Sequence, residues 1–170
     1  VTPVRGEKWP RPHAHPELRR PCNGRLEQVT LGHTFQTDIV EFGMPGFVAP
    51  GEDPAQRAAS RVAVVTVLAE GAARALQLRR EDLETTYYID GSETVFVLYD
   101  NVPGGAGLAR EVFSSFADVF VEALNVVGRC TCGADSSCYG CIRTYRNQPH
   151  HDHLDRGFVA STLQSVIDVL

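Results

Sequence analysis

The chain has 170 residues, of which 43% are hydrophobic and 22% are charged, and its formal net charge is −5. This length and composition allow a folded domain with a hydrophobic core and exclude an intrinsically disordered chain. No apolar run reaches the about 18 residues that a membrane-spanning helix needs. No leader peptide follows Val1, so we expect a cytoplasmic protein, either an excised domain or a stand-alone chain.

Lysine is nearly missing, since Lys8 is the single lysine beside 15 arginines. The phosphate-binding loop of ATPases needs a lysine after its glycines, and Schiff-base catalysis needs a reactive lysine. Lys8 lies in a Pro-rich stretch that matches neither context. The composition therefore argues against an ATPase motor or a lysine-dependent catalyst within this chain.

Charge is unevenly distributed along the sequence. Residues 1–30 carry a net charge of +3, residues 31–128 carry −8, and residues 129–156 carry +1 together with three histidines. The acidic middle argues against nucleic-acid binding over the whole surface, but it leaves room for a local basic patch at the two ends. An ordinary solvated surface is the alternative interpretation.

Proline and apolar patterns divide the chain into an arm and a domain. Five prolines within residues 1–24 predict a Pro-rich arm or connector, followed by one domain over residues 25–170. The domain begins with two predicted strands, at residues 26–31 and 37–42, and a Pro/Gly loop over residues 45–54.

Apolar residues at spacings of three and four then predict a helix over residues 54–78, with Pro54 in its first turn and more than one buried side. Two strands follow at residues 85–90 and 94–99, joined by a short hairpin loop at residues 91–93.

A second helix is predicted over residues 106–127, with Gly128 as the glycine that follows its end. After a cysteine-rich loop, a last helix is predicted from about His153, with Asp152 as its N-cap. Its inner face is predicted to hold Val159, Leu163, Val166 and Leu170. The order ββ-α-ββ-α-loop-α predicts an α+β fold, in which helices cover a small, mostly antiparallel sheet.

The strongest chemical signal is a set of four cysteines within twelve residues: Cys130, Cys132, Cys138 and Cys141. Four thiolates so close in sequence can surround one tetrahedral ion. Gly140 allows a tight turn that directs amides at a sulfur, and Cys141 is predicted to open a helical turn over residues 142–146. The spacing therefore predicts a zinc site.

Other uses of these cysteines are less favoured. An iron–sulfur cluster is the second alternative, and disulfides are the third, because a Cys130–Cys132 bridge would be strained and five cysteines are an odd number. Four cysteine ligands leave no open position on zinc, so the predicted ion is structural rather than catalytic. Cys22 is predicted to be a free thiol.

A glycine-rich turn between the strand at residues 94–99 and the following helix contains Gly104, Gly105 and Gly107. Such a turn can bind a phosphate or another anion with its amides. The dinucleotide pattern fails, however, because Arg110 occupies the third glycine position. The favoured interpretation is a structural turn in which Asp100 caps amides, and the alternative is a loop that holds a DNA phosphate.

Catalytic patterns are weak. His33 and Asp38 lie near the first predicted hairpin, and Asp100 could approach them. A small metal-dependent nuclease or hydrolase that uses these three side chains is therefore the alternative function, although no nucleophile motif accompanies them.

Taken together, these motifs resemble those of the MrfA zinc-binding domain family. The resemblance is carried by LGHTFQTDIVEF, LYDNVPGGAGLAREVF, CTCGADSSCYGCIRTYRNQ and HLDR, in that order, and covers about residues 26–168. It implies a structural zinc ion on the four cysteines. It also implies a non-catalytic accessory domain of a superfamily 2 DNA helicase, in DNA repair or phage defence, that works with a motor in cis or in trans.

The expected DNA contacts lie around the zinc loop, on single strands or junctions. The candidates for phosphate contacts are Arg129, Arg143, Arg146 and Arg156, and those for base stacking are Tyr139 and Tyr145. A pure scaffold that docks on other domains without touching DNA is the competing hypothesis.

Overall fold

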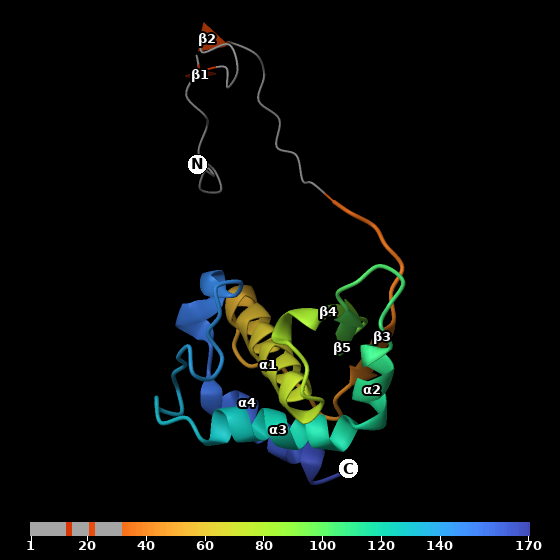
Figure 1. Ribbon diagram of the computed structural model, residues 1–170. Helices are drawn as coiled ribbons and strands as arrows, with labels where there is room; N and C mark the ends of the chain where they lie inside the picture. The colour runs from red at the N-terminus through yellow and green to blue at the C-terminus, as the bar shows by residue number, and fades with distance from the viewer. Residues whose placement is uncertain (1–12, 15–20, 23–31) are drawn as a thin grey trace. The chain divides into compact units, whose positions relative to one another are not determined.

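The computed structural model describes residues 13–14, 21–22 and 32–170, and the chain divides into two units, residues 1–34 and 35–170 (Figure 1). In the first unit, strands β1 (His13–Ala14) and β2 (Pro21–Cys22) pair in antiparallel fashion.

The rest of the predicted Pro-rich arm, residues 1–24, lies outside the described residues, as does the predicted strand at residues 26–31. The domain boundary between residues 24 and 25 stays a prediction.

The second unit contains a three-stranded antiparallel sheet. Its strands are β3 (Ile39–Gly43), β4 (Leu83–Asp90) and β5 (Glu93–Asp100), in the spatial order β3-β5-β4. The hairpin between β4 and β5 forms as predicted, with Asp90 opposite Glu93. Strand β5 is the central strand, and its sequence is almost continuously apolar because one of its faces is buried and the other is buried or half-buried over most of its length.

Helices pack against this sheet and against one another. They are α1 (Pro54–Ala75), α2 (Leu108–Ser114), α3 (Phe116–Gly128) and α4 (Arg156–Ile167), with short 3-10 helices η1 (Arg80–Asp82) and η2 (Gln148–His153). The predicted fold class, a small α+β domain with an antiparallel sheet and a four-cysteine cluster, is confirmed. Among the helices of the described residues, none is long and apolar enough to cross a membrane.

Helix α1 forms the centre of the second unit. The side chain of Asp53 accepts a hydrogen bond from the Ala55 N–H, and Pro54 occupies the first turn as predicted. The helix is buried on more than one side because the sheet, α3, α4 and η2 all contact it. Gly71 allows α1 and α3 to pack closely, since a Cβ at this position would lie 2.5 Å from the Val119 carbonyl oxygen of α3.

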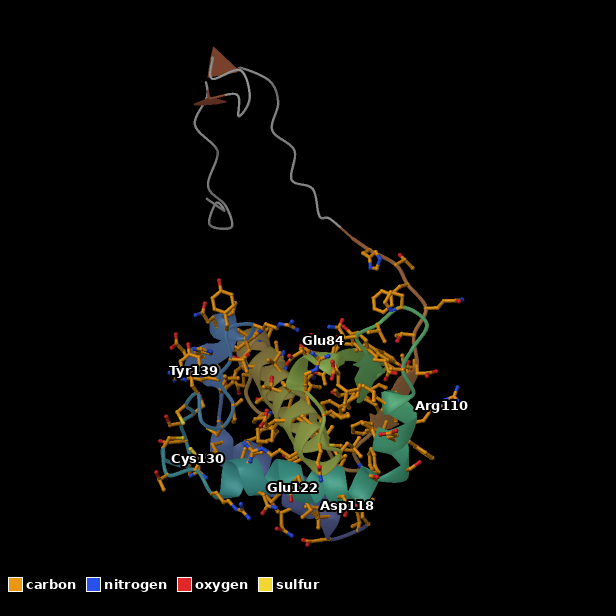
Figure 2. All side chains as sticks on the ribbon, in the orientation of Figure 1. Glu84, Arg110, Asp118, Glu122, Cys130 and Tyr139 are labelled. Atoms are coloured by element: carbon orange, nitrogen blue, oxygen red, sulfur yellow. The ribbon has the colours of Figure 1, made fainter. Side chains whose placement is uncertain are left out.

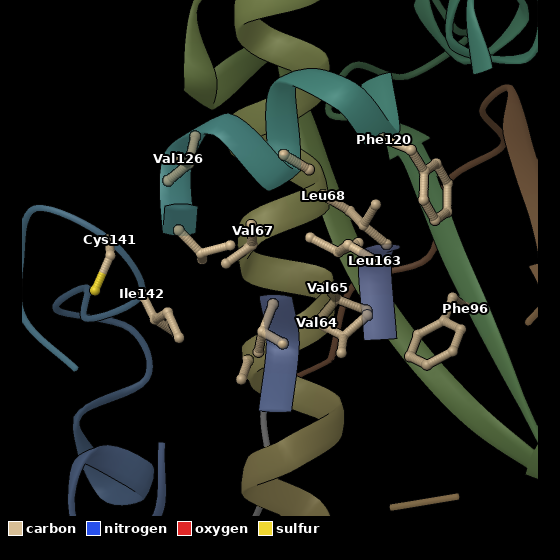
Figure 3. Close-up of a cluster of buried hydrophobic side chains, with 14 of the residues drawn as sticks. Val64, Val65, Val67, Leu68, Phe96, Phe120, Val126, Cys141, Ile142 and Leu163 are labelled. Atoms are coloured by element: carbon tan, nitrogen blue, oxygen red, sulfur yellow. The ribbon is translucent and has the colours of Figure 1, made fainter. Parts of the chain in front are cut away.

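The hydrophobic core surrounds α1 (Figure 3). Leu68 of α1, Phe96 of β5, Phe120 of α3 and Leu163 of α4 are all fully buried in it. Ile142, from the chain just after the cysteines, is buried in the same cluster. The cysteine segment is therefore anchored in the core rather than attached to the surface.

The predicted helix over residues 106–127 is wrong as one continuous element. The helix breaks at Ser115, which separates α2 from α3. Ser114 donates its hydroxyl hydrogen to the Arg110 carbonyl oxygen, and serines compete with the backbone in this way. The break lets Val112 pack against the sheet beside Val40 and Leu98, while α3 follows α1.

Three predicted helix ends are also corrected. Gly128 is the last residue of α3, and the chain turns at Arg129 in right-handed helical geometry, so no left-handed glycine is needed. Helix α4 is capped by Asp155, which accepts from the Phe158 N–H, because the 3-10 helix η2 already contains Asp152. Leu170 lies beyond α4 and is exposed, whereas the other predicted inner residues of α4 are buried.

Candidate metal centre

The four cysteines lie in the segment between α3 and η2, which we call the cysteine loop (Cys130–Cys141). All four Sγ atoms lie within 4.8 Å of one another. The Sγ–Sγ distances are 3.5 Å for Cys130–Cys138, 3.7 Å for Cys132–Cys141 and 3.8 Å for Cys138–Cys141. Tetrahedral zinc with bonds of about 2.3 Å places its sulfurs about 3.8 Å apart. The cluster therefore fits a single structural zinc ion, and its sulfurs are too far apart for disulfide bonds.

Backbone amides direct the cysteine loop toward this arrangement. The Cys138 N–H donates to the Sγ of Cys141, and the Gly140 N–H donates to the Sγ of Cys138. Such bonds stabilise thiolates and orient them toward a metal. The predicted helical turn over residues 142–146 is wrong. Instead, the amides of Cys141, Ile142 and Arg143 all donate to the Cys138 carbonyl oxygen in one tight turn.

Arg156 attaches the cysteine loop to the helices. Its Nε donates to the Gly133 carbonyl oxygen and its Nη1 to the Val127 carbonyl oxygen, both at 2.9 Å. The Gly157 N–H adds a bond to the Ala134 carbonyl oxygen. The start of α4, the end of α3 and the loop are therefore held together on one side, which fixes the sulfur positions.

The surroundings shift the cysteine pKa values in opposite directions. Burial raises the pKa of Cys141 to about 12, because the anion loses its hydration, and burial also raises the pKa of Cys132. Hydrogen bonds from Cys132, first through its backbone and then through its thiol, lower the pKa of Cys130 to about 7. Without metal, Cys132 and Cys141 therefore keep their protons at neutral pH.

Zinc affinity is expected to fall steeply with acidification. Zinc must displace the protons of Cys132 and Cys141, so about two protons or more leave per ion and affinity drops about 100-fold or more per pH unit below pH 7. Because Cys130 titrates near pH 7, zinc affinity falls still more steeply below that pH. Competition with a chromophoric chelator at several pH values measures this slope. A change of less than about tenfold per unit would contradict a four-thiolate site.

The structure separates the predicted DNA contacts into two groups. Tyr139 and Tyr145 are 67% and 83% exposed, and Figure 2 shows Tyr139 on the same side of the second unit as Cys130. Arg129 is also exposed. By contrast, Arg143 and Arg156 are half-buried and hydrogen-bonded within the protein.

Arg146 forms an ion pair with Glu84 of β4. This pair joins the segment after the cysteine loop to the outer strand of the sheet. The hydrogen bond to Glu84 and the negative charge of that carboxylate raise the pKa of Arg146, which stays charged throughout the accessible pH range.

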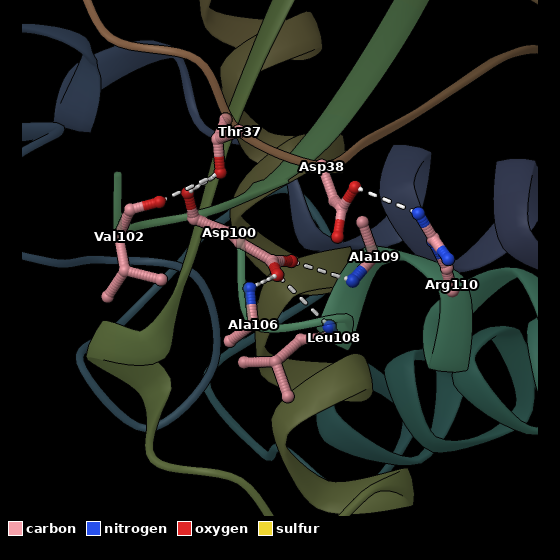
Figure 4. A network of polar contacts seen from close by, with 8 residues as sticks. All are labelled: Thr37, Asp38, Asp100, Val102, Ala106, Leu108, Ala109 and Arg110. Carbon is pink, nitrogen blue, oxygen red and sulfur yellow. Dashed lines mark hydrogen bonds and ion pairs between the residues drawn. The ribbon is translucent and has the colours of Figure 1, made fainter. Parts of the chain in front are cut away.

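Asp100 organises the glycine-rich turn (Figure 4). Its fully buried carboxylate accepts from the amides of Ala106 at 2.5 Å, Leu108 at 3.1 Å and Ala109 at 2.7 Å. Gly104 donates its own N–H to the Gln36 carbonyl oxygen. These bonds favour the structural turn, since the amides of Gly104, Gly105, Ala106, Leu108 and Ala109 already have partners. An anion site at Gly104, Gly105 and Gly107 stays a prediction.

The backbone explains why this turn needs glycines. Gly104, Gly105 and Gly107 all have positive φ angles, between 75° and 89°. A Cβ on Gly105 would also lie 2.7 Å from the Oδ2 of Asp38. All three glycines are thus required by their backbone geometry, and Gly105 is also required by the close approach of Asp38.

The side chains proposed for the alternative hydrolase, His33, Asp38 and Asp100, do not form a metal-binding site. Asp100 is occupied by three amides, and Asp38 faces Arg110 at 3.5 Å. His33 belongs to the first unit. Within the described residues, the four cysteines are the one group of three or more His, Cys, Asp or Glu side chains that could hold a metal ion.

Sequence reasoning missed Asn147, which is 4% exposed and connects the cysteine loop to α1. Its Nδ2 donates to the Ile142 carbonyl oxygen at 2.9 Å and to the Thr66 hydroxyl at 3.4 Å. Its Oδ1 accepts from the Thr144 N–H and from Nε2 of His151. Nothing in the sequence shows that this asparagine is buried, because its burial depends on the packing of this segment against α1, where Thr66 lies.

Comparison with known proteins agrees with this geometry. Residues 64–142 match the family model of the MrfA Zn-binding domain. The predicted resemblance is confirmed, and the matched stretch runs from α1 to Ile142 and includes all four cysteines. The match to a zinc-binding domain and the spacing of the four sulfurs both fit a structural zinc ion rather than an iron–sulfur cluster.

Two curated proteins align with the chain. The Druantia protein DruE of Escherichia coli (strain UMEA 4076-1) is 28% identical over 162 residues, which cover 87% of this chain and 9% of DruE. The uncharacterized ATP-dependent helicase YprA of Bacillus subtilis (strain 168) is 44% identical over 54 residues, which cover 32% of this chain and 7% of YprA. The chain thus spans less than a tenth of either relative.

Two solved structures have a fold similar to that of this chain. The DUF1998 helicase MrfA bound to DNA superposes with a TM-score of 0.50 at 24% identity, covering 71% of this chain and 16% of that one. The same helicase bound to DNA and AMPPNP gives a TM-score of 0.55 at 19% identity, covering 87% and 18%.

Proposed function

We propose that this chain is a non-catalytic, zinc-stabilised accessory domain of a superfamily 2 DNA helicase. The observation that carries the proposal is a four-cysteine cluster anchored in a helical core that matches the MrfA Zn-binding domain. Four sulfur ligands leave no open coordination position for a substrate or water, so the zinc ion has a structural rather than a catalytic role. We assign the zinc ligands to Cys130, Cys132, Cys138 and Cys141.

The descriptions of the related proteins support the proposed partners, a helicase motor and DNA. YprA is described as an ATP-dependent helicase, and the two MrfA structures are described as bound to DNA. We therefore propose that this domain braces a helicase motor, in cis or in trans, and contacts DNA. DNA repair or phage defence in the cytoplasm is the proposed setting.

The test uses the helicase protein or complex that carries this chain. Cys132→Ser is expected to lower zinc content and strand separation, while the motor keeps part of its ATP hydrolysis, because the ligand lies outside the motor. Cys22→Ser is the matched control, since it removes the fifth cysteine and is expected to leave zinc content and unwinding unchanged. A Cys132→Ser protein that has lost its zinc and still separates strands at the unaltered rate would overturn the proposal.

A further inference from the structure

We infer that this domain contacts DNA through a stacking platform for unpaired bases, formed by Tyr139 and Tyr145, rather than through a phosphate-binding arginine patch. The inference rests on the proposed function and specifies which form of DNA the site takes.

The arginines near the cysteine loop are already engaged. Arg156 donates to two backbone carbonyl oxygens and joins α3, α4 and the loop. Arg143 donates from Nε to the Ser137 hydroxyl at 3.1 Å and from Nη2 to the His151 carbonyl oxygen at 3.4 Å. Arg146 is paired with Glu84. A phosphate would have to compete with these bonds. Arg129 and Arg146 are both exposed, but Arg146 is paired with Glu84, so among the described residues Arg129 remains as the exposed arginine of the four without an ion pair.

The two tyrosines are available instead. Between residues 122 and 168, Tyr139 and Tyr145 are the large hydrophobic side chains that are exposed. Exposed aliphatic side chains, such as Ile39 and Val121, lie on other elements. A protein-docking surface would combine aromatic and aliphatic side chains, whereas aromatic rings in a polar surround suit the faces of nucleic-acid bases.

One hydrogen-bond network supports the Tyr139 ring and the backbone next to Tyr145. The ring of Tyr139 meets that of His151 edge to face, with 5.6 Å between centroids. The Nε2 of His151 lies 3.1 Å from the Thr144 carbonyl oxygen and 3.0 Å from Oδ1 of Asn147. Both partners are acceptors, so Nε2 carries a hydrogen and donates to them.

The same network fixes the backbone on which the second ring stands. Tyr145 directly follows Thr144, whose N–H and carbonyl oxygen both belong to the network. Asn147 in turn connects this network to Ile142 and α1. Because the supporting backbone is held in place, binding loses less conformational entropy than it would on a mobile loop.

Stacking on tyrosines selects unpaired DNA. Bases in a duplex already stack on one another, whereas the faces of unpaired bases are free. Binding by stacking also depends weakly on salt, because few phosphate counterions are released. We therefore expect the domain to prefer single-stranded DNA. We also expect its affinity to depend only weakly on salt, as for about one phosphate contact, which Arg129 could provide.

The experiment measures fluorescence anisotropy of the zinc-loaded, full 170-residue chain with an oligothymidylate of about 12 nucleotides and with a duplex of equal length. Tyr139→Ala and Tyr145→Ala are each expected to weaken single-strand binding by about 5- to 100-fold, while the Phe variants keep most of it. Tyr88→Ala, which removes another exposed tyrosine from β4, is the matched control and is expected to change affinity less than twofold. Unchanged zinc content and circular dichroism verify the fold of each variant.

The outcomes separate the two proposals. Single-strand preference, loss with Ala, rescue by Phe and a slope of log K against log salt shallower than about −1 support the stacking platform. Binding that is as tight on duplex, insensitive to both tyrosines or steeply salt-dependent overturns the platform and leaves the DNA-contacting accessory domain in place. Absence of binding to either DNA overturns the platform and the proposed DNA contact together, and favours a protein partner for this surface.

Discussion

Stripping zinc from the folded chain is expected to unfold the cysteine loop and to loosen α4 and η2 with it. Cys141 and Ile142 are buried in the core around α1, so the loop cannot open without exposing apolar surface. Structural zinc contributes about 10–16 kcal/mol of apparent binding free energy in small domains, which exceeds or equals the usual stability of a domain, about 5–15 kcal/mol. Loss of the ion should therefore cost most of the folding free energy.

Cys141→Ser is expected to reproduce most of this loss, by at least about 3 kcal/mol, because it removes a ligand and leaves a buried hydroxyl in its place. Urea unfolding of the zinc-loaded proteins, followed by circular dichroism, measures the difference. Ser136→Ala in the same loop is the control and is expected to stay within about 0.5 kcal/mol of the original chain. An unaltered spectrum after verified removal of the metal would contradict a structural role for zinc.

Asp100 is the second position at which a single substitution should be costly. Its buried carboxylate accepts three backbone N–H groups at the start of α2, and removing a buried acceptor leaves those donors without partners. Hydrogen bonds to charged groups contribute about 1.5–3 kcal/mol each, although not additively. Asp100→Ala is therefore expected to destabilise the domain by about 3–5 kcal/mol, and Asp100→Asn by about 2–3 kcal/mol, because the amide keeps one acceptor oxygen.

Zinc content distinguishes this loss from failure of the metal site. The cysteine loop lies beyond α3, so moderate destabilisation at Asp100 should lower the unfolding midpoint while the folded protein still holds its zinc. Asp90→Asn, on the exposed end of the β4–β5 hairpin, removes a carboxylate without buried partners and should change the unfolding free energy by less than about 0.5 kcal/mol. If Asp100→Asn behaves like Asp90→Asn, the cap does not stabilise the turn.

Local sequence signals predicted the elements that depend on neighbouring residues. The hairpin between β4 and β5 follows from two β-rich runs and a short glycine loop, and α1 follows from its apolar spacing and Pro54. The amide cap by Asp100 was also predicted, because strand, carboxylate, glycines and helix follow one another within a few residues.

Features decided by distant partners were not predictable in the same way. The break at Ser115 arises because Val112 must face the sheet while Phe120 must face α1, and periodicity alone shows one continuous stripe. Asp155 replaces Asp152 as the cap of α4 because the buried Leu154 fixes where the chain leaves η2. The partners that Arg143, Arg146 and Arg156 have within the protein could not be predicted for the same reason, since their acceptors lie elsewhere in the chain.

The sequence by itself determined the kind of domain and its metal, because zinc binding depends on four thiols at a short spacing and the strands and helices depend on local patterns. The tertiary structure alone decided which side chains remain free for a partner. Arginines that look basic and available in sequence are hydrogen-bonded within the fold, while two tyrosines stay exposed, and only the three-dimensional neighbours of a polar group determine whether it is already satisfied.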